Sequence, residues 1–295
     1  LGQVNIMASV IFAGMSGSAT SDAAGLGTIE LEAMLDAGYD KEFAVAITAA
    51  SSLIGPIIPP SIPLVLYGVS AGASVGALLL GGIIPGLLMA ATLMVMVALY
   101  AMRRDYLIRK RPTLGEIWNS LLDAFPPLVT PVIIIGGIFW GWFTPTEAGA
   151  VGAFSLFVIT YLEKKIDYEK LKKAVGDTTK LTAMIFLLVA GATVFGRFFA
   201  ITRIPFELSS WVTGFNMPPF LIMGMVIIIY FILGMIIDAL PLILLTIPIF
   251  FPLVTDTLGY DPIWFGVVIL LITSMAVMTP PVGLNVYIIK GVAKD

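Results

Sequence analysis

The sequence predicts an all-α membrane protein that crosses the bilayer several times. Of its 295 residues, 59% are hydrophobic and only 12% are charged, a balance that soluble domains of this length do not have. Residues 43–102 contain no charged side chain, and a charge at the bilayer centre costs at least about 2.5 kcal/mol. Within that stretch Pro59 and Pro60 remove two backbone donors, so we expect a helix that unwinds inside the membrane.

The composition also limits the chemistry that the chain can carry. Histidine and cysteine are both absent, which excludes disulfides, thiolate chemistry and histidine-based acid–base catalysis. The remaining oxygen atoms, from hydroxyls, carboxylates and backbone carbonyls, suit alkali or alkaline-earth cations better than transition metals. The chain does not start with methionine, and Leu1 already lies in an apolar run, so we expect a fragment that lacks its N-terminal part.

The first hundred residues predict a re-entrant hairpin followed by two crossings. Residues 1–15 are apolar, but as a helix they measure about 22 Å and are too short to span. They lead into small and hydroxyl-rich residues, which are typical of a tight tip, and the chain then returns to an acidic connection. The expected elements are a tip at 14–22, a return at 28–35, a connection at 36–42, a span at 43–70 broken at 55–63, and a crossing at 77–102.

Two basic loops set the predicted orientation of the middle of the chain. Residues 103–111 carry five basic side chains and one acidic side chain, and lysines gather again at residues 164–173. The positive-inside rule places both loops in the cytoplasm, which agrees with two crossings between them. The expected elements are crossings at 117–143 and 147–162, an interfacial segment at 167–177, a crossing at 181–202 and an outer connection at 203–217.

The last part of the chain repeats the pattern of the first part. We expect entry from outside at 219–236, a tip at 234–241, a return at 242–256, and a final span at 263–289 broken at 279–283. The Gly-Met and Pro-Pro pairs are 45 residues apart in the first unit and 46 apart in the second, and an aspartate follows each Gly-Met pair. Since the charge bias gives the two hairpins opposite entrances, the units are predicted to be inverted repeats. Corresponding breaks in two halves indicate a transporter binding site.

Five strings make the chain resemble the large membrane subunit of tripartite ATP-independent periplasmic (TRAP) transporters, the DctM-like family. They are GMSGSATSDAAG at 14–25, GPIIPPSIP at 55–63, PTEAGAVG at 145–152, GMIIDAL at 234–240 and TPPVGLN at 279–285. The resemblance implies an ion-transporter-superfamily elevator fold in the bacterial inner membrane, with no enzymatic activity. It also implies that roughly the N-terminal third of the protein is missing from this chain.

The same resemblance implies a function, partners and a domain division. The function is sodium-coupled uptake of organic anions, such as C4-dicarboxylates or sialic acid. The implied partners are a small membrane subunit (DctQ-like), a periplasmic substrate-binding protein (DctP-like) and the lipid bilayer, without nucleic acid. Residues 1–75 and 203–295 would each hold one hairpin and one broken helix of a transport domain, and residues 76–202 would link it to the scaffold.

Two sodium sites are implied by the resemblance, each between a hairpin tip and a break, where freed carbonyls can bind a cation. The candidates are Ser16, Ser18, Asp22 and Gly55 for the first site, and Asp238, Thr279 and Gly283 for the second. The two serines have an alternative role in helix packing through small residues. The two aspartates have an alternative role as caps at the N-terminus of a half-helix.

The substrate is expected between the two tips, where half-helix N-termini and bound sodium attract an anion. Ser61, Thr246 and Asn285 are polar residues near the breaks that can contact it, and their alternative is a hydrogen bond to nearby backbone. Arg197 lies in the otherwise uncharged run 181–202, and its planar guanidinium suits a carboxylate. Its alternative is to extend towards the outer interface.

Other charged residues have simpler interpretations. A helix is predicted to start near Glu147, with either Thr144 or Thr146 as its cap, and with Pro145 and Glu147 in its first turn. Arg203 and Glu207 are expected to form a surface pair.

Alternative functional classes stay open at this stage. A stand-alone sodium–carboxylate symporter of related fold would need no binding protein. An intramembrane aspartyl protease would use Asp22 and Asp238 as a pair that shares a proton, although they are predicted in separate hairpins of opposite orientation. A passive channel is disfavoured by the closed tips, and the sequence does not identify the anion.

Overall fold

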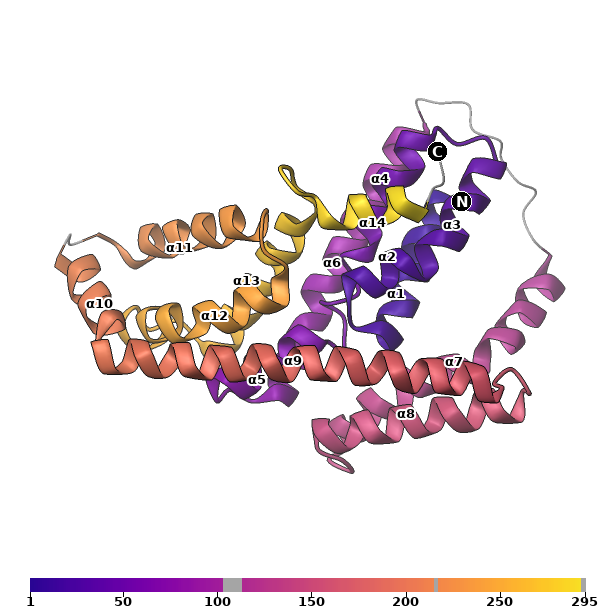
Figure 1. The fold of residues 1–295 in the computed structure, drawn as a ribbon. Coiled ribbons are helices and arrows are strands. Elements are labelled where there is room, and N and C mark those ends of the chain that lie inside the picture. Colours follow the sequence, from indigo (N-terminus) through magenta and orange to yellow (C-terminus); the bar gives the residue numbers. More distant parts are fainter. Residues whose placement is uncertain (103–112, 215–216, 293–295) are drawn as a thin grey trace. The chain divides into compact units, whose positions relative to one another are not determined.

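The computed structural model describes residues 1–102, 113–214 and 217–292, and within these ranges it contains helices and no strands (Figure 1). The all-α prediction is therefore confirmed for the described residues. They belong to two compact units, one drawn from residues 1–106 and 191–295 and the other from residues 107–190. The predicted first basic loop, at 103–111, lies outside the described residues.

Several helices have the length and apolar composition of membrane spans. In the described part of the chain, four such helices are α6 (Val75–Ala101), α8 (Pro145–Leu162), α9 (Tyr168–Thr202) and the continuous stretch Ala239–Thr257. Shorter apolar helices, among them α1 and α13, accompany them. This content confirms the prediction of a multi-pass membrane protein.

The first hairpin consists of α1 (Gly2–Ser16), α2 (Ala19–Ala24) and α3 (Leu26–Asp36). The chain turns back at Gly17, whose backbone is left-handed with φ 60°, and the return is two helices that meet at Gly25. Both arms pack against α4 (Lys41–Ser52), and α1 also packs against α6. The core of this packing includes Ile6, Leu31, Met34 and Ile47.

The first broken span consists of α4 and α5 (Ile62–Ala71), with nonhelical residues 53–61 between them. Two glycines of α6 let this break approach closely. A Cβ at Gly82 would lie 2.4 Å from the Ile57 carbonyl oxygen, and a Cβ at Gly86 would lie 2.5 Å from the Ile58 side chain. The break therefore packs against α6 at two positions where any side chain larger than that of glycine would overlap it.

The second hairpin and broken span consist of α11 (Pro219–Gly234), α12 (Ala239–Phe251), α13 (Pro262–Met278) and α14 (Leu284–Val292). The predicted break at 279–283 is present. A π-helix, η1 (Pro252–Thr257), continues α12, and the sequence did not predict it. The two repeats pack together in one unit, since α12 and α13 contact α5, and the Tyr67 hydroxyl donates to the Pro262 carbonyl at 2.7 Å.

The middle of the chain begins with α7 (Leu114–Phe139) and α8, which pack against each other. Thr144 caps α8 with Pro145 and Glu147 in the first turn, as predicted, and Thr113 and Glu116 form the same capping box on α7. Next, α9 is one helix of 35 residues, about 52 Å long. The predicted interfacial segment at 167–177 and the predicted crossing at 181–202 thus lie on one continuous helix, which no proline interrupts. The position of the segment along the interface stays a prediction.

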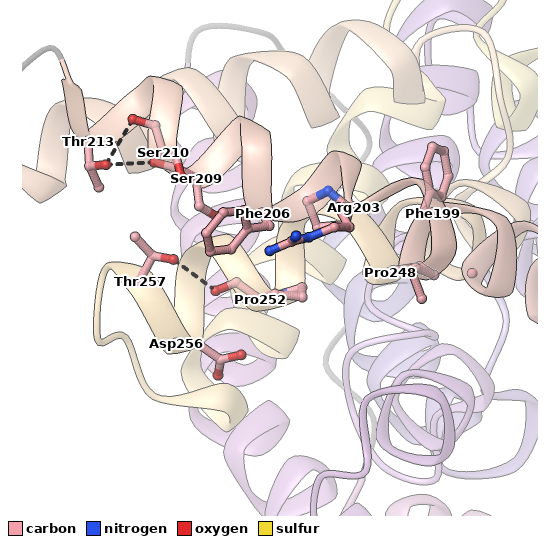
Figure 2. Close-up of a pocket in the computed structure, with 13 residues that line it drawn as sticks. Phe199, Arg203, Phe206, Ser209, Ser210, Thr213, Pro248, Pro252, Asp256 and Thr257 are labelled. Carbon is pink, nitrogen blue, oxygen red and sulfur yellow. Dashed lines mark hydrogen bonds between the residues drawn. The ribbon is translucent and has the colours of Figure 1, made fainter.

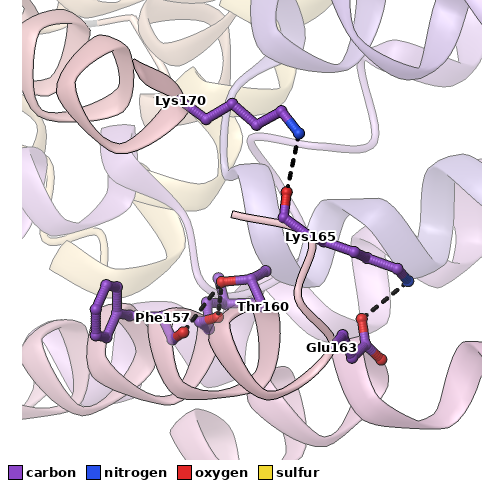
Figure 3. A network of polar contacts seen from close by, with 6 residues as sticks. Phe157, Thr160, Glu163, Lys165 and Lys170 are labelled. Carbon is purple, nitrogen blue, oxygen red and sulfur yellow. Dashed lines mark hydrogen bonds and ion pairs between the residues drawn. The ribbon is translucent and has the colours of Figure 1, made fainter. Parts of the chain in front are cut away.

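The turn between α8 and α9 carries the predicted second basic loop and is held by short-range polar contacts (Figure 3). Lys165 pairs with Glu163 at 2.9 Å, and the Lys170 ammonium donates to the Lys165 carbonyl at 3.1 Å. Asp167 accepts from the Lys170 backbone amide at 2.8 Å and so caps the first turn of α9. Exposed ion pairs contribute little stability, so the backbone bonds matter more for the shape of this turn.

The cap on α7 predicts a pH-dependent contribution to stability. The Glu116 carboxylate accepts from the Thr113 amide at 2.7 Å, and this bond, with the Thr113 hydroxyl, holds the pKa of Glu116 below its ordinary value of 4.5. A lowered pKa means that the stabilisation is present above pH 4.5 and is lost as the pH falls through the lowered pKa. We expect Glu116→Ala to lower the melting temperature at pH 7, by a margin that shrinks below pH 4.5.

The control is Glu207→Ala, which removes an exposed carboxylate from the first turn of α10 (Ile204–Gly214). A Glu116→Ala deficit that stays constant across the pH series contradicts the capping account.

Candidate functional site

The tip of the first hairpin lies directly against the first break. A Cβ at Gly17 would be 2.5 Å from the Pro60 carbonyl oxygen, so a side chain at this position would displace the break. The Ile62 amide donates to the Gly17 carbonyl at 3.4 Å, which ties the tip to the start of α5. Tip and break thus form one structural element, at the place where the resemblance implies the first sodium site.

Asp22 is the charged group at this contact, and its side chain is only 1% exposed. One carboxylate oxygen, Oδ1, accepts from the Ser16 hydroxyl. The other, Oδ2, is buried and has no hydrogen-bond donor among the described residues. A Cβ at Gly55 would lie 2.6 Å from Oδ2, so the missing side chain at Gly55 makes room for the carboxylate.

Ser18 completes the first predicted set through its backbone. Its hydroxyl hydrogen-bonds the Thr20 hydroxyl at 2.9 Å, while its carbonyl oxygen lies 3.3 Å from where a Cβ of Gly55 would be. Asp22 sits in the first turn of α2, whose N-cap, Ser18, makes no side-chain capping bond. The structure therefore brings Ser16, Ser18, Asp22 and Gly55 together, and Asp22 does not act as the cap.

The second broken span also reaches this region, because α14 packs against α2 and α4. The Asn285 amide group donates to the Ser52 hydroxyl oxygen at 3.1 Å, and the Ser52 hydroxyl donates in turn to the Ala49 carbonyl at 2.8 Å. The Ser52 hydroxyl donates its only proton to Ala49, so it can only accept from Asn285. The Asn285 NH₂ group is therefore directed at Ser52, and Asn285 Oδ1 is directed away from Ser52. That oxygen is also buried without a described donor.

Sequence reasoning missed Ser52. It lies in an ordinary helical stretch, and its partner is 233 residues away, so no local signal marks it.

The second predicted set is arranged differently. Asp238 caps α12, with its Oδ1 accepting from the Ala239 amide at 2.8 Å, which is its alternative role. The Thr279 hydroxyl donates to the Met275 carbonyl at 2.9 Å, and Gly283 adopts φ 60°. Among the described residues no hydrogen bond or glycine contact joins Asp238 to Thr279 or Gly283. The second sodium site stays a prediction.

Two of the polar residues predicted to contact substrate, Ser61 and Thr246, have hydrogen-bond partners within the protein. Ser61 is buried, donates to the Pro56 carbonyl and accepts from the Leu64 amide at 3.2 Å. Thr246 is buried and hydrogen-bonds the Tyr230 hydroxyl at 2.7 Å and the Leu242 carbonyl at 2.6 Å. Arg197 is exposed on α9. These contacts match the backbone alternatives for Ser61 and Thr246, and the substrate roles stay predictions.

Comparison with known proteins identifies the family. The sequence profile described as "Tripartite ATP-independent periplasmic transporter, DctM component" matches residues 1–295. The large permease protein of a sialic acid TRAP transporter from Vibrio cholerae is 43% identical over 293 residues, which are 99% of this chain and 68% of the relative. The corresponding protein of a 2,3-diketo-L-gulonate TRAP transporter from Escherichia coli is 38% identical over 295 residues, which are 100% of this chain and 69% of the relative.

A third relative, the large permease protein of a C4-dicarboxylate TRAP transporter from Pseudomonas aeruginosa, is 35% identical over 288 residues, which are 97% of this chain and 67% of the relative. These relatives are transporter permeases and not enzymes, so the aspartyl protease alternative is set aside. The chain belongs to the DctM family of TRAP transporter components, and it is a multi-pass protein of the bacterial inner membrane.

The contact between tip and break predicts a difference between two glycines. Gly17 and Gly72 both have left-handed backbones, with φ 60° and 67°, but nothing lies within 4 Å of a Cβ at Gly72. Alanine in this conformation costs about 1 kcal/mol at either position. We expect Gly17→Ala to lower the melting temperature more than Gly72→Ala, because only Gly17→Ala also overlaps the Pro60 carbonyl. Equal losses would show that the tip does not need the close approach.

Proposed function

We propose that this member of the DctM family is the membrane transport subunit of a sodium-coupled importer of organic anions. The observation that carries the proposal is the buried Asp22 carboxylate, which lies between a hairpin tip and a helix break with one oxygen lacking a donor. A carboxylate in such surroundings is costly unless a cation or proton faces it. A cation that binds there would offset this cost, and its concentration gradient would supply the free energy for transport.

The available groups suit sodium. The oxygens are the Ser16 hydroxyl, the Asp22 carboxylate and backbone carbonyls such as that of Ser18, all of them hard ligands. The described residues contain no group of three acidic, histidine or cysteine side chains that could hold a metal ion. Besides Asp22, the first hairpin has a second buried carboxyl group, Glu30, which is close enough to Asp22 to interact with it electrostatically. A monovalent cation would neutralise the Asp22 carboxylate. Sodium would supply the positive charge. By binding oxygens of both the tip and the break, it would also hold the two together.

The ion would thereby couple to the substrate. With sodium bound, the Gly17 tip, the break and the nearby Asn285 would be held in one arrangement, and the N-terminus of α5 would face the bound anion. We infer that the hairpin-bearing unit then moves against a scaffold in an elevator motion and releases both solutes inside. The second set, Asp238, Thr279 and Gly283, would bind a further sodium ion once its tip and break approach each other.

The relatives suggest the substrate class and the partners. Their names give sialic acid, 2,3-diketo-L-gulonate and C4-dicarboxylate, which are all organic anions. A tripartite system has two components besides this one, and we propose a small membrane subunit and a periplasmic substrate-binding protein. The choice among organic anions is a matter for a transport assay.

Replacement of Asp22 tests the ion coupling. In proteoliposomes with the small subunit and the binding protein, we expect Asp22→Asn to raise the sodium concentration for half-maximal uptake at least about tenfold, because asparagine cannot balance the cation. Asp36→Asn, which changes an exposed aspartate at the end of the same hairpin, should leave it unchanged. Sodium dependence that is identical in Asp22→Asn and wild type contradicts the assignment. Uptake that needs sodium but no binding protein would support the stand-alone symporter instead.

A further inference from the structure

A cavity of about 620 Å³ lies between α9 and α10 on one side and α12 and η1 on the other (Figure 2). It is found where two candidate membrane spans end, since α9 ends at Thr202 and the α12–η1 stretch ends at Thr257. The end of a span lies at the depth of the lipid headgroups. The cavity is therefore placed where phospholipid headgroups are concentrated, and it is separate from the Asp22 site.

Two opposite charges line this cavity without pairing. Arg203 and Asp256 both belong to its wall, and among the described residues neither takes part in an ion pair. The Arg203 guanidinium lies over the Phe206 ring, 4.9 Å from its centroid, so the predicted surface pair with Glu207 is not what the structure contains. In the described part of the chain, the one side-chain donor to Asp256 is the neighbouring Thr255 hydroxyl, at 3.0 Å.

The backbone at both charges is unusual. Arg203 has φ 56°, a left-handed conformation that is uncommon for residues other than glycine and that separates α9 from α10. Asp256 lies in the π-helix η1, and single π-helical turns are frequent at functional sites. Strained or irregular backbone persists where the surrounding structure or a ligand compensates for it. Here it brings a cation and an anion to one cavity.

The rest of the wall combines apolar and hydroxyl groups. Phe199, Pro248 and Pro252 form apolar surface, and Ser209 and Ser210 add hydroxyls on α10. A ligand that fits this wall carries an anion, a cation that can donate hydrogen bonds, and an apolar part. A purely anionic group would meet the Asp256 carboxylate, and a purely cationic group would meet Arg203.

We propose that this cavity binds the headgroup of a zwitterionic phospholipid that carries a phosphate and a primary ammonium, as phosphatidylethanolamine does. The phosphate would accept from Arg203, whose planar fork matches two phosphate oxygens. The ammonium would donate to Asp256, and the glycerol and upper acyl chains would lie on the aromatic and proline surface. Such a lipid would join the end of the second hairpin to α9 and α10.

Native mass spectrometry of the purified full chain tests the proposal. The protein would be released from bilayers that contain equal amounts of phosphatidylethanolamine, phosphatidylcholine and phosphatidylglycerol. We expect the wild type to retain phosphatidylethanolamine in preference to the other two lipids. Arg203→Gln and Asp256→Asn should each lower that retention about tenfold, the value of a hydrogen bond to a charged group. The matched control, Arg197→Gln, removes an exposed cation from α9 that does not line the cavity, and this variant should retain as much phosphatidylethanolamine as the wild type.

Several outcomes would overturn the proposal. Equal retention by Arg203→Gln and wild type would show that the arginine binds no headgroup, provided that circular dichroism shows the same helix content. Equal retention of all three lipids would remove the role of Asp256. Soluble phosphoethanolamine that displaces the lipid at equal concentration would point to a small solute as the ligand.

Discussion

The requirement to compensate a buried carboxylate organises the first half of this structure. Asp22 is almost completely removed from solvent, and only one of its oxygens receives a hydrogen bond from the residues that the structure describes. Two glycines create the arrangement, because Gly17 lets the hairpin tip approach the break and Gly55 leaves space for the carboxylate. Small residues are thus needed where the tip, the break and the Asp22 carboxylate meet. The glycines of α6 in turn allow the break to pack closely against α6.

The two repeats use one sequence pattern for different local structures. In the first repeat, Asp22 makes no capping bond and lies against the break, whereas Asp238 in the second repeat caps α12. Asn285 connects them, since it belongs to the second broken span and bonds Ser52 of the first. An asymmetry of this kind suits a transporter in which one tip is held closed while the other can move, which is how we interpret it within the proposed function.

Features with a local cause could be predicted from the sequence, and features that depend on distant partners could not. Pro59-Pro60 and Pro280-Pro281 interrupt their helices because proline lacks a backbone donor. The start of α8 at the Thr144 cap is likewise set by residues within one turn. The four residues predicted for the first sodium site lie close together, and they were grouped because they resemble a family motif; their role in sodium binding stays a prediction. The bond between Ser52 and Asn285 and the cavity at Arg203 and Asp256 arise only once helices from remote segments pack. The continuity of α9 was not predicted, because the change from lysine-rich to apolar residues along it suggested two elements.

Sodium-dependent thermal unfolding of the purified chain tests the central claim most directly. An ion that binds only the folded protein raises the melting temperature in proportion to the logarithm of its concentration. We predict that sodium, but not potassium, raises the melting temperature of the wild type, and that Asp22→Asn removes most of this rise. A rise of the same size in Asp22→Asn would contradict the claim that Asp22 binds sodium.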